Sequence, residues 1–317
     1  LTRSRVCAMA EGVRDVAKLP DPVGRVLSGA TLANGLEMEK ITVPLGVIGI
    51  IFEARPNVTS DAAALCLKSG NACILRGGKE AIRSNTAVAS AMRAALKAVG
   101  MDENCVCLIE DTARETATAM MRLNGYIDCL IPRGGAGLIR SVVENASVPV
   151  IETGVGNCHA YVEKSGDIAM AAEIVFNAKT SRPSVCNALE TLLVDEEIAL
   201  QALPAIAARL KEKNVELRGC ARTCEILPEA VPACENDYAI EFLDYILAVK
   251  VVSGIDEALA HIRRYSSHHS ECIITRDLAA ARRFAREVDS AAVYVNASTR
   301  FTDGGVFGLG AEIGIST

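Results

Sequence analysis

Several features that would point to common protein classes are missing from this sequence of 317 residues. It contains no block of five or more like charges, and its formal net charge is −6. Both observations argue against a nucleic-acid groove or an anionic membrane surface as the partner. The longest apolar run, Val43–Phe52, contains Pro44 and two glycines, and it is far shorter than the roughly 18 residues that a membrane helix needs. No charged-then-apolar leader opens the sequence, so we expect no signal peptide and a cytoplasmic protein.

A C-x-x-C pair is also missing, which disfavours a thiol-redox protein. The twelve cysteines are scattered, mostly through apolar segments such as 72–75 and 104–108. A chain of this size needs no disulfide framework, so we interpret them as reduced thiols that act as small hydrophobic residues. Cys220, Cys224 and Cys234 form one loose cluster, but their spacing fits no common zinc pattern, and we predict no metal site.

An Asn34-Gly35 pair stands between two extended runs and predicts a β-hairpin over residues 29–43. Beyond Gly46, runs that are apolar throughout alternate with helical stretches, of which 85–99 is the clearest. This rhythm predicts an α/β fold with doubly wound parallel sheets, in two series that meet near residues 150–155. Strands are expected at 46–52, 72–75, 105–109, 127–131 and 148–151, then at 191–194, 245–252, 272–275 and 292–296; further helices are expected at 198–213, 256–265 and 278–288.

Two basic, glycine-rich turns lie between a predicted strand and a predicted helix. The first contains Arg76, Gly77, Gly78 and Lys79, and the second contains Arg133, Gly134 and Gly135. Ligands bind at the carboxyl ends of strands in open parallel sheets, where glycines allow close backbone approach and cations attract phosphate. Neither turn is a G-x-G-x-x-G fingerprint, and a tight connection is the alternative for each. Two such turns on one sheet edge favour a binding site for a nucleotide phosphate over two simple connections.

Cys186 differs from most of the other cysteines because it follows a polar, basic loop that contains proline. Cations at Lys179 and Arg182 would lower the thiol pKa from about 8.5 and raise the thiolate fraction. Composition alone leaves a buried structural thiol as the alternative to a reactive one.

Five blocks of the sequence resemble the γ-glutamyl phosphate reductases, a family of the aldehyde dehydrogenase superfamily. They occur in the family's order and span nearly the whole chain, at 44–58, 70–80, 131–137, 177–188 and 293–310. The resemblance implies an aldehyde-dehydrogenase-like fold with an NADP-binding domain (1–28 and 44–152), a β-hairpin arm for oligomerisation (29–43) and a catalytic domain (153–317). It also implies that family members extend beyond both ends of this sequence.

The activity implied by the resemblance is NADPH-dependent reduction of L-glutamyl 5-phosphate to L-glutamate 5-semialdehyde, the second step of proline biosynthesis. Cys186 matches the family's nucleophile, whose attack would expel phosphate and leave a thioester. The candidate donors to the developing oxyanion are the Cys186 backbone N–H and the Asn57 amide; an ordinary turn residue is an equal alternative for Asn57. Glu241 resembles the glutamate that holds the nicotinamide ribose in relatives, with a solvated carboxylate as the alternative.

The remaining predictions concern ligands and partners. The candidate NADP(H) residues are the seven of the two glycine-rich turns and Glu241. The candidate donors to the substrate α-carboxylate are Ser298, Thr299, Arg300, Gly304 and Gly305; a loop that only closes the second domain is the alternative. We expect a homodimer or larger homo-oligomer and a functional link to glutamate 5-kinase.

Two other functions remain open, an aldehyde dehydrogenase that oxidises a semialdehyde and an inactive dinucleotide-binding module. Glu152 stands where hydrolytic aldehyde dehydrogenases keep a general base, and its role stays undecided. Oxidation of a semialdehyde would need a base that activates water beside the thiol. The basic loop before Cys186 suits the binding of an anionic phosphate better than it suits that role.

Overall fold

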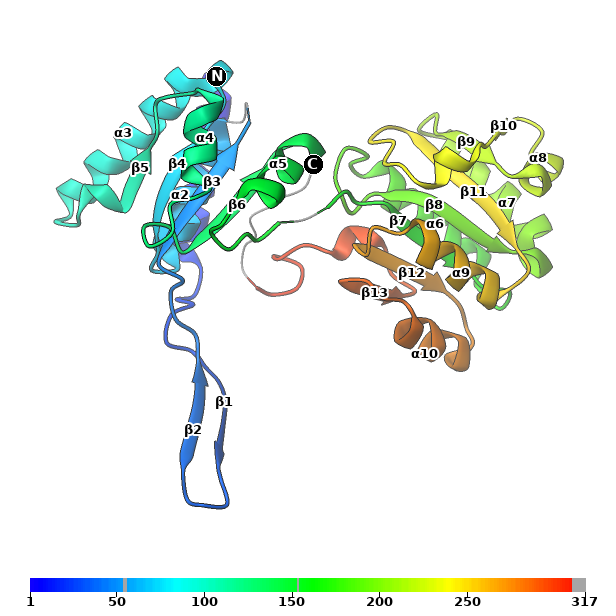
Figure 1. Cartoon of the computed structure of the whole chain (residues 1–317). Coiled ribbons are helices and arrows are strands. Elements are labelled where there is room, and N and C mark those ends of the chain that lie inside the picture. The colour runs from blue at the N-terminus through cyan, green and yellow to red at the C-terminus, as the bar shows by residue number, and fades with distance from the viewer. Residues whose placement is uncertain (54–55, 153, 310–317) are drawn as a thin grey trace. The chain divides into compact units, whose positions relative to one another are not determined.

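The computed structural model describes residues 1–53, 56–152 and 154–309. The chain divides into two compact units, Leu1–Thr153 (unit 1) and Gly154–Gly308 (unit 2) (Figure 1). Within the described residues, no helix has both the length and the apolar character needed to cross a membrane.

Unit 1 is built on a parallel four-stranded sheet in the order β5-β4-β3-β6. Its strands are β3 (Val47–Phe52), β4 (Ala72–Arg76), β5 (Val106–Leu108) and β6 (Cys129–Arg133). Its helices are α1 (Arg3–Lys18), α2 (Pro56–Lys68), α3 (Ile82–Ala98), α4 (Arg114–Met120) and α5 (Ala136–Asn145), with 3₁₀ turns η1 (Lys79–Ala81) and η2 (Glu103–Cys105). Successive residues of β3 enter different cores: Ile50 packs with α2 and α3 residues, and Ile51 packs with α4 residues. Both faces of the sheet are therefore covered, which explains why β3 is apolar throughout.

The predicted hairpin consists of β1 (Val26–Thr31) and β2 (Glu37–Ile41), which pair antiparallel. The turn places Gly35 at a φ of 83°, in the left-handed region that glycine favours. Every residue of both strands is exposed in this chain, so the hairpin belongs to neither core (Figure 1, blue).

Unit 2 contains a parallel seven-stranded sheet in the order β10-β9-β11-β8-β7-β12-β13. Its strands are β7 (Cys158–Val162), β8 (Leu189–Asp195), β9 (Glu216–Gly219), β10 (Val231–Pro232), β11 (Ile246–Val252), β12 (Ser270–Ile274) and β13 (Ala292–Val295). Its helices are α6 (Ile168–Thr180), α7 (Glu196–Lys211), α8 (Ala221–Ile226), α9 (Ile255–Tyr265) and α10 (Leu278–Glu287), with 3₁₀ turns η3 (Glu235–Tyr238) and η4 (Thr299–Phe301).

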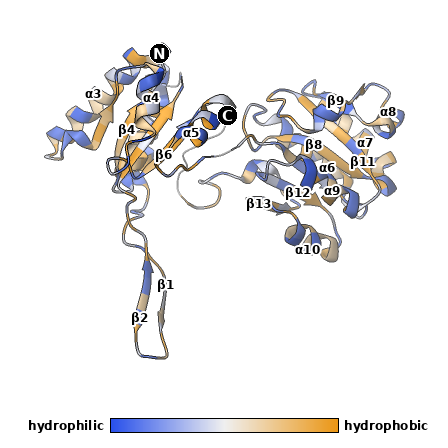
Figure 2. Cartoon of the chain, in the orientation of Figure 1, coloured by the Kyte–Doolittle hydropathy of each residue, from blue (hydrophilic) through white to orange (hydrophobic). Residues whose placement is uncertain are grey.

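The seven-stranded sheet also has an apolar core on each face. Leu192 and Val194 of β8 pack with α6 and α7 residues, whereas Leu193 packs with residues of α9 and α10. The sheet is accordingly rich in apolar residues (Figure 2), and β8 is buried along its whole length, with Glu190, Thr191 and Asp195 among its buried residues. The doubly wound parallel fold expected from the sequence is confirmed in both units.

Some details differ from the prediction, among them the short strands β9 and β10, which were not predicted. The expected strand at 148–151 forms only an isolated bridge between Val150 and Leu130. Strand β7 was not predicted, because its Cys158-His159-Ala160-Tyr161-Val162 sequence mixes polar and apolar residues although all five are buried. The His159 backbone N–H donates to the Glu271 carboxylate at 2.6 Å, and this carboxylate lies 3.3 Å from the imidazole Nδ1.

Candidate active site

Cys186 lies in the loop that leads from α6 to β8, and its side chain is half-buried. The Ala188 N–H donates to the Val185 carbonyl at 3.0 Å and closes a turn around the cysteine. The Cys158 thiol donates to the Cys186 carbonyl at 3.2 Å. These bonds fix the loop backbone, so Cys186 is held in place while its side chain stays partly accessible.

Gly156 is pressed against the same loop. A Cβ on Gly156 would lie 1.7 Å from the Cys186 carbonyl oxygen, far inside any real contact. The Gly156 N–H donates to Oε1 of Glu241 at 2.5 Å. The structure thus brings two predicted site residues, Cys186 and Glu241, to either side of one glycine. Burial raises the pKa of the Glu241 carboxyl.

The segment of predicted substrate residues closes over the residue after the cysteine. The Thr299 hydroxyl donates to the Asn187 carbonyl at 2.7 Å, and the Asn187 amide donates to the Thr302 carbonyl at 2.8 Å. The Arg300 guanidinium donates to the Asn187 side-chain oxygen and, through Nε, to the Ser181 hydroxyl at 3.0 Å. The Cys186 loop and residues 299–302 therefore form one hydrogen-bonded unit.

Several of the predicted carboxylate donors already have partners within the chain. Ser298 caps η4, where its hydroxyl oxygen accepts the Arg300 N–H at 3.2 Å. The Gly305 N–H donates to Asp303 Oδ1 at 2.9 Å, and Gly304 is buried. These bonds order the segment, and its role in substrate binding stays a prediction.

Lys179 has a different place from the one expected. It lies in the last turn of α6, wholly buried, and its Nζ is 2.7 Å from Oε2 of Glu190. Composition suggested a cation in the loop that would lower the Cys186 pKa; the structure pairs this cation with a carboxylate of β8 instead. Arg182 is exposed, as a solvent-facing loop cation should be.

The glycine-rich turns of unit 1 lie at the carboxyl ends of β4 and β6, on either side of β3. A Cβ on Gly77 would lie 2.2 Å from the Asn85 amide nitrogen, so the first turn packs tightly. Gly135 is the N-cap of α5 and has open space where a Cβ would stand. No side chain caps this helix, and the Gly135 N–H donates to Glu53 at 3.2 Å. An uncapped helix start beside open space fits the phosphates of a dinucleotide.

The cationic side chains of these turns differ in their exposure and their hydrogen-bond partners. The Arg76 Nη2 donates to the carbonyls of Thr112 and Ala113, at 2.5 and 3.0 Å, and so holds the segment before α4. Lys79 is exposed in η1, immediately after Gly78. Arg133 ends β6 and is half-buried. Lys79 is thus the cation of the first turn that stands free in solvent to meet a phosphate.

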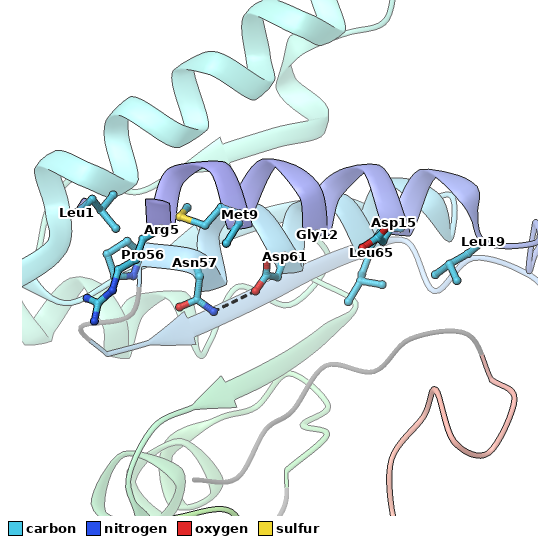
Figure 3. A pocket seen from close by; sticks show the side chains of 12 residues that line it. Leu1, Arg5, Met9, Gly12, Asp15, Leu19, Pro56, Asn57, Asp61 and Leu65 are labelled. Carbon is cyan, nitrogen blue, oxygen red and sulfur yellow. Dashed lines mark hydrogen bonds between the residues drawn. The ribbon is translucent and has the colours of Figure 1, made fainter. Parts of the chain in front are cut away.

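Asn57 lies in the first turn of α2, where its amide Nδ2 donates to Oδ2 of Asp61 at 3.0 Å. It lines a groove of about 640 Å³ between α1 and α2, together with side chains such as Arg5 and Met9 (Figure 3). Its role as an oxyanion donor stays a prediction, and that donor would have to leave Asp61. Over the residues that the structure describes, no three His, Cys, Asp or Glu side chains are grouped to hold a metal ion.

Two residues of this arrangement were not singled out from the sequence, namely Gly156 and Asn187. Asn187 directly follows the cysteine within the family-like block, so its neighbourhood was a usable signal. Gly156 gives no such signal, because its contact with Cys186 spans thirty positions of chain.

Comparison with known proteins places these features in a family. Residues 3–224 match the model of the aldehyde dehydrogenase family. The γ-glutamyl phosphate reductases of Carboxydothermus hydrogenoformans and Moorella thermoacetica are 63% and 60% identical over 317 residues, which is 100% of this chain and 76% of each relative. The crystal structure of γ-glutamyl phosphate reductase from Thermotoga maritima is 52% identical and superimposes with a TM-score of 0.95, covering 100% of this chain and 77% of that one.

More distant structures share the fold, among them an acetylating aldehyde dehydrogenase from Geobacillus thermoglucosidasius at 18% identity and a TM-score of 0.68. The resemblance drawn from the five sequence blocks is confirmed by these findings. The chain belongs to the aldehyde dehydrogenase family of nicotinamide-dependent oxidoreductases and, within it, to the γ-glutamyl phosphate reductases.

Proposed function

We propose that this chain reduces L-glutamyl 5-phosphate to L-glutamate 5-semialdehyde and phosphate with NADPH, the second step of proline biosynthesis. The observation that carries the proposal is similarity over the entire chain, at 57–63% identity, to proteins named γ-glutamyl phosphate reductase. The half-buried Cys186, in a loop fixed from several sides, is consistent with that chemistry.

Cys186 acts as the nucleophile in this proposal. Its thiolate attacks the acyl-phosphate carbon, the bond from that carbon to the phosphate oxygen breaks, and a thioester to Cys186 remains. Phosphate leaves as a stable anion, so no strong general acid is needed. When bound, the nicotinamide cofactor supplies the hydride that reduces the thioester carbon. Cys186 then departs as a thiolate and frees the aldehyde.

The oxyanion that forms on the carbonyl needs donors that are already in place. We assign this role to the Cys186 backbone N–H, which the surrounding loop bonds hold still, and to the Asn57 amide. Asn57 must exchange its bond to Asp61 for one to substrate. Arg300 and its neighbours in 298–305 are assigned to the α-carboxylate of the substrate, at the border of the Cys186 loop.

Cofactor binding is assigned to the two turns of unit 1 and to Glu241 of unit 2. The start of α5 at Gly135, which has open space beside it, suits the pyrophosphate, and the Gly135 N–H would exchange its bond to Glu53 for one to that group. Lys79 is assigned to the 2′-phosphate that distinguishes NADP from NAD, and Glu241 to the nicotinamide ribose.

The test is the reverse reaction, oxidation of glutamate 5-semialdehyde by NADP in the presence and absence of phosphate. The proposal expects turnover that requires phosphate or arsenate. Turnover that ignores phosphate would favour an aldehyde dehydrogenase that oxidises the semialdehyde, and cofactor binding without turnover would favour an inactive module. Cys186→Ala should abolish turnover and keep cofactor binding, whereas the control Cys234→Ala, at an exposed thiol of the same unit, should match the wild type.

We further propose that the β1–β2 hairpin joins this chain to a second copy of itself. Both strands are exposed, and they carry the large apolar side chains of Val26, Leu27, Met38 and Ile41 at the surface. Exposed apolar strands of this kind call for a partner. Replacing residues 27–40 by a short glycine-serine turn should reduce the mass measured by light scattering. A functional link to glutamate 5-kinase stays a prediction.

A further inference from the structure

A buried ion pair lies behind the cysteine loop. The Lys179 Nζ and the Glu190 Oε2 are 2.7 Å apart, and the two side chains are 0% and 1% exposed. Burial lowers the pKa of Lys179 and raises that of Glu190, so each charge depends on the other. Removing two charges from water is costly, and an apolar pair of similar size often stabilises a fold as well. Stability alone is therefore a weak reason for this pair.

The pair joins the two ends of the loop that carries Cys186. Lys179 lies in the last turn of α6, before the loop begins, and Glu190 lies in β8, just after it ends. The bond between them closes this loop at its base. The Cys186 backbone itself is also held by bonds that do not involve the pair, from the Cys158 thiol and within the Val185–Ala188 turn.

The second oxygen of Glu190 reaches a different segment. Oε1 accepts the Leu243 N–H at 3.4 Å, and Leu243 adopts a φ of 56°, which is unusual for a non-glycine residue. Such a backbone conformation persists only where the surroundings impose it. The Lys179 ammonium also lies 6.0 Å from the centre of the Phe242 ring. The ion pair thus anchors the two residues that follow Glu241.

Glu241 links the ion pair back to the cysteine loop. Its carboxylate accepts the Gly156 N–H, and Gly156 touches the Cys186 backbone. Two routes therefore connect the cysteine to the carboxylate, one through Gly156 and one through the ion pair. Together they set the position of the Glu241 carboxylate with respect to Cys186.

We propose that Lys179 and Glu190 are positioning residues, which hold Glu241 in register with Cys186 so that the nicotinamide lies where the thioester can accept a hydride. This inference rests on the proposed function, because it assigns Cys186 the thioester and Glu241 the cofactor ribose. Hydride transfer needs close alignment of donor and acceptor, and a misplacement of about 1 Å can reduce a rate about 100-fold. Attack of the thiolate on the acyl phosphate involves no contact with Glu241, so the ion pair should matter less for that step.

The experiment compares the two steps in Lys179→Met, Glu190→Gln and a matched control. The control is Glu173→Gln, which breaks the Glu173–Arg209 ion pair at 2.7 Å on the exposed side of the same helix α6. In Lys179→Met we expect the burst of phosphate release to change less than threefold and hydride transfer to fall at least tenfold. A primary isotope effect with 4-deuterated NADPH should grow accordingly. Glu190→Gln retains an acceptor for the Leu243 N–H and should lose less, and Glu173→Gln should match the wild type.

A second readout needs neither cofactor nor turnover. Deuterium exchange of peptides that contain Gly156 and Leu243 should be at least tenfold faster in Lys179→Met than in the wild type or Glu173→Gln. The inference is overturned if exchange and isotope effect stay at wild-type values, or if acylation and hydride transfer fall equally. If Lys179→Met fails to fold, Glu190→Gln decides by the same two criteria. Failure of the proposed function is seen separately, as a wild-type protein without phosphate-dependent turnover.

Discussion

The two units are built on the same parallel design, yet they present their candidate residues at opposite edges of the sheet. In unit 1 the glycine-rich turns follow β4 and β6, at the carboxyl edge. In unit 2 Gly156, Cys186 and Glu241 precede β7, β8 and β11, at the amino edge. Residues 299–302 reach this edge as well, because Thr302 bonds to Ser270 at the start of β12 at 2.6 Å. The candidate residues of unit 1 follow the rule that ligands bind at the carboxyl ends of parallel strands, and those of unit 2 depart from it.

The carboxyl edge of unit 2 is occupied by polar contacts of its own. The Thr275 hydroxyl donates to Glu163 at 2.7 Å, and the Thr275 N–H donates to Asn296 at 2.9 Å. The Tyr161 hydroxyl donates to Asp195 at 2.8 Å. These bonds tie the strand ends of β7, β8, β12 and β13 together. The candidate residues of unit 2 lie instead in the loops that enter the strands, at the other edge.

Glycine also serves opposite purposes in the two units. Gly135 leaves open space at the start of α5, which a ligand can fill, whereas the space at Gly156 is filled by the Cys186 backbone. The first kind of glycine should tolerate a methyl group until a ligand arrives, and the second should not tolerate one at all.

The largest effect is expected from Gly156→Ala. The added Cβ would meet the Cys186 carbonyl oxygen at 1.7 Å, so the cysteine loop must move. We expect phosphate-dependent turnover to fall at least 100-fold, on the scale of a misplaced reacting group, and the free energy of unfolding to fall by about 1–3 kcal/mol. Gly154→Ala is the control, because nothing lies within 4 Å of a Cβ there. Equal, small effects of the two variants would contradict the tight packing behind Cys186.

The next effect concerns the two cations of the first glycine-rich turn. Lys79 is exposed, whereas Arg76 is engaged with the carbonyls of Thr112 and Ala113. Charge-assisted hydrogen bonds contribute about 1.5–3 kcal/mol, so Lys79→Ala should weaken NADPH binding roughly tenfold and leave NADH binding nearly unchanged. Arg76→Ala should weaken both cofactors alike, because it releases the segment before α4.

Fluorescence titration with each cofactor measures both variants, and Lys97→Ala, at an exposed lysine in the last turn of α3, serves as the control. A selective loss in Arg76→Ala together with none in Lys79→Ala would exchange the two assignments.

Local sequence features predicted the parts of the fold that depend on nearby residues. An unbroken apolar run located β3, shorter apolar stretches located parts of β8 and β12, and Asn34-Gly35 located the hairpin turn, because burial on both faces and a positive φ leave direct traces. The arrangement of the site left no such trace. Whether Lys179 serves Cys186 or Glu190 depends on which way a helix end turns, and composition does not contain that information. Cys186 itself was found through the family resemblance, since the loop composition left two interpretations open.

The smallest expected effect is an acid sensitivity of stability that comes from histidine, which only unit 2 can show. All four histidines lie in unit 2, and His261 of α9 is buried among Tyr238, Tyr265 and His159, with ring centres 5.1, 4.6 and 5.6 Å away. Burial lowers the pKa of His261 from 6.5 to about 3, with His159, Lys250 and Arg264 adding to the shift and Glu257 opposing it. At mildly acidic pH, His261 therefore binds a proton in the unfolded chain and stays neutral in the folded chain. Its contribution to stability is complete above pH 6.5 and is lost as the pH falls from 6.5 toward 3. At pH 5.5 this loss is about 1 kcal/mol.

His261→Phe keeps an aromatic ring in the cluster and should remove that part of the acid sensitivity, measured as the difference in the free energy of urea unfolding of unit 2 between pH 7.5 and 5.5. The control is His268→Gln, at an exposed ring, which should leave the difference unchanged. If His261→Phe leaves it unchanged too, the acid sensitivity of unit 2 arises from other groups and not from His261.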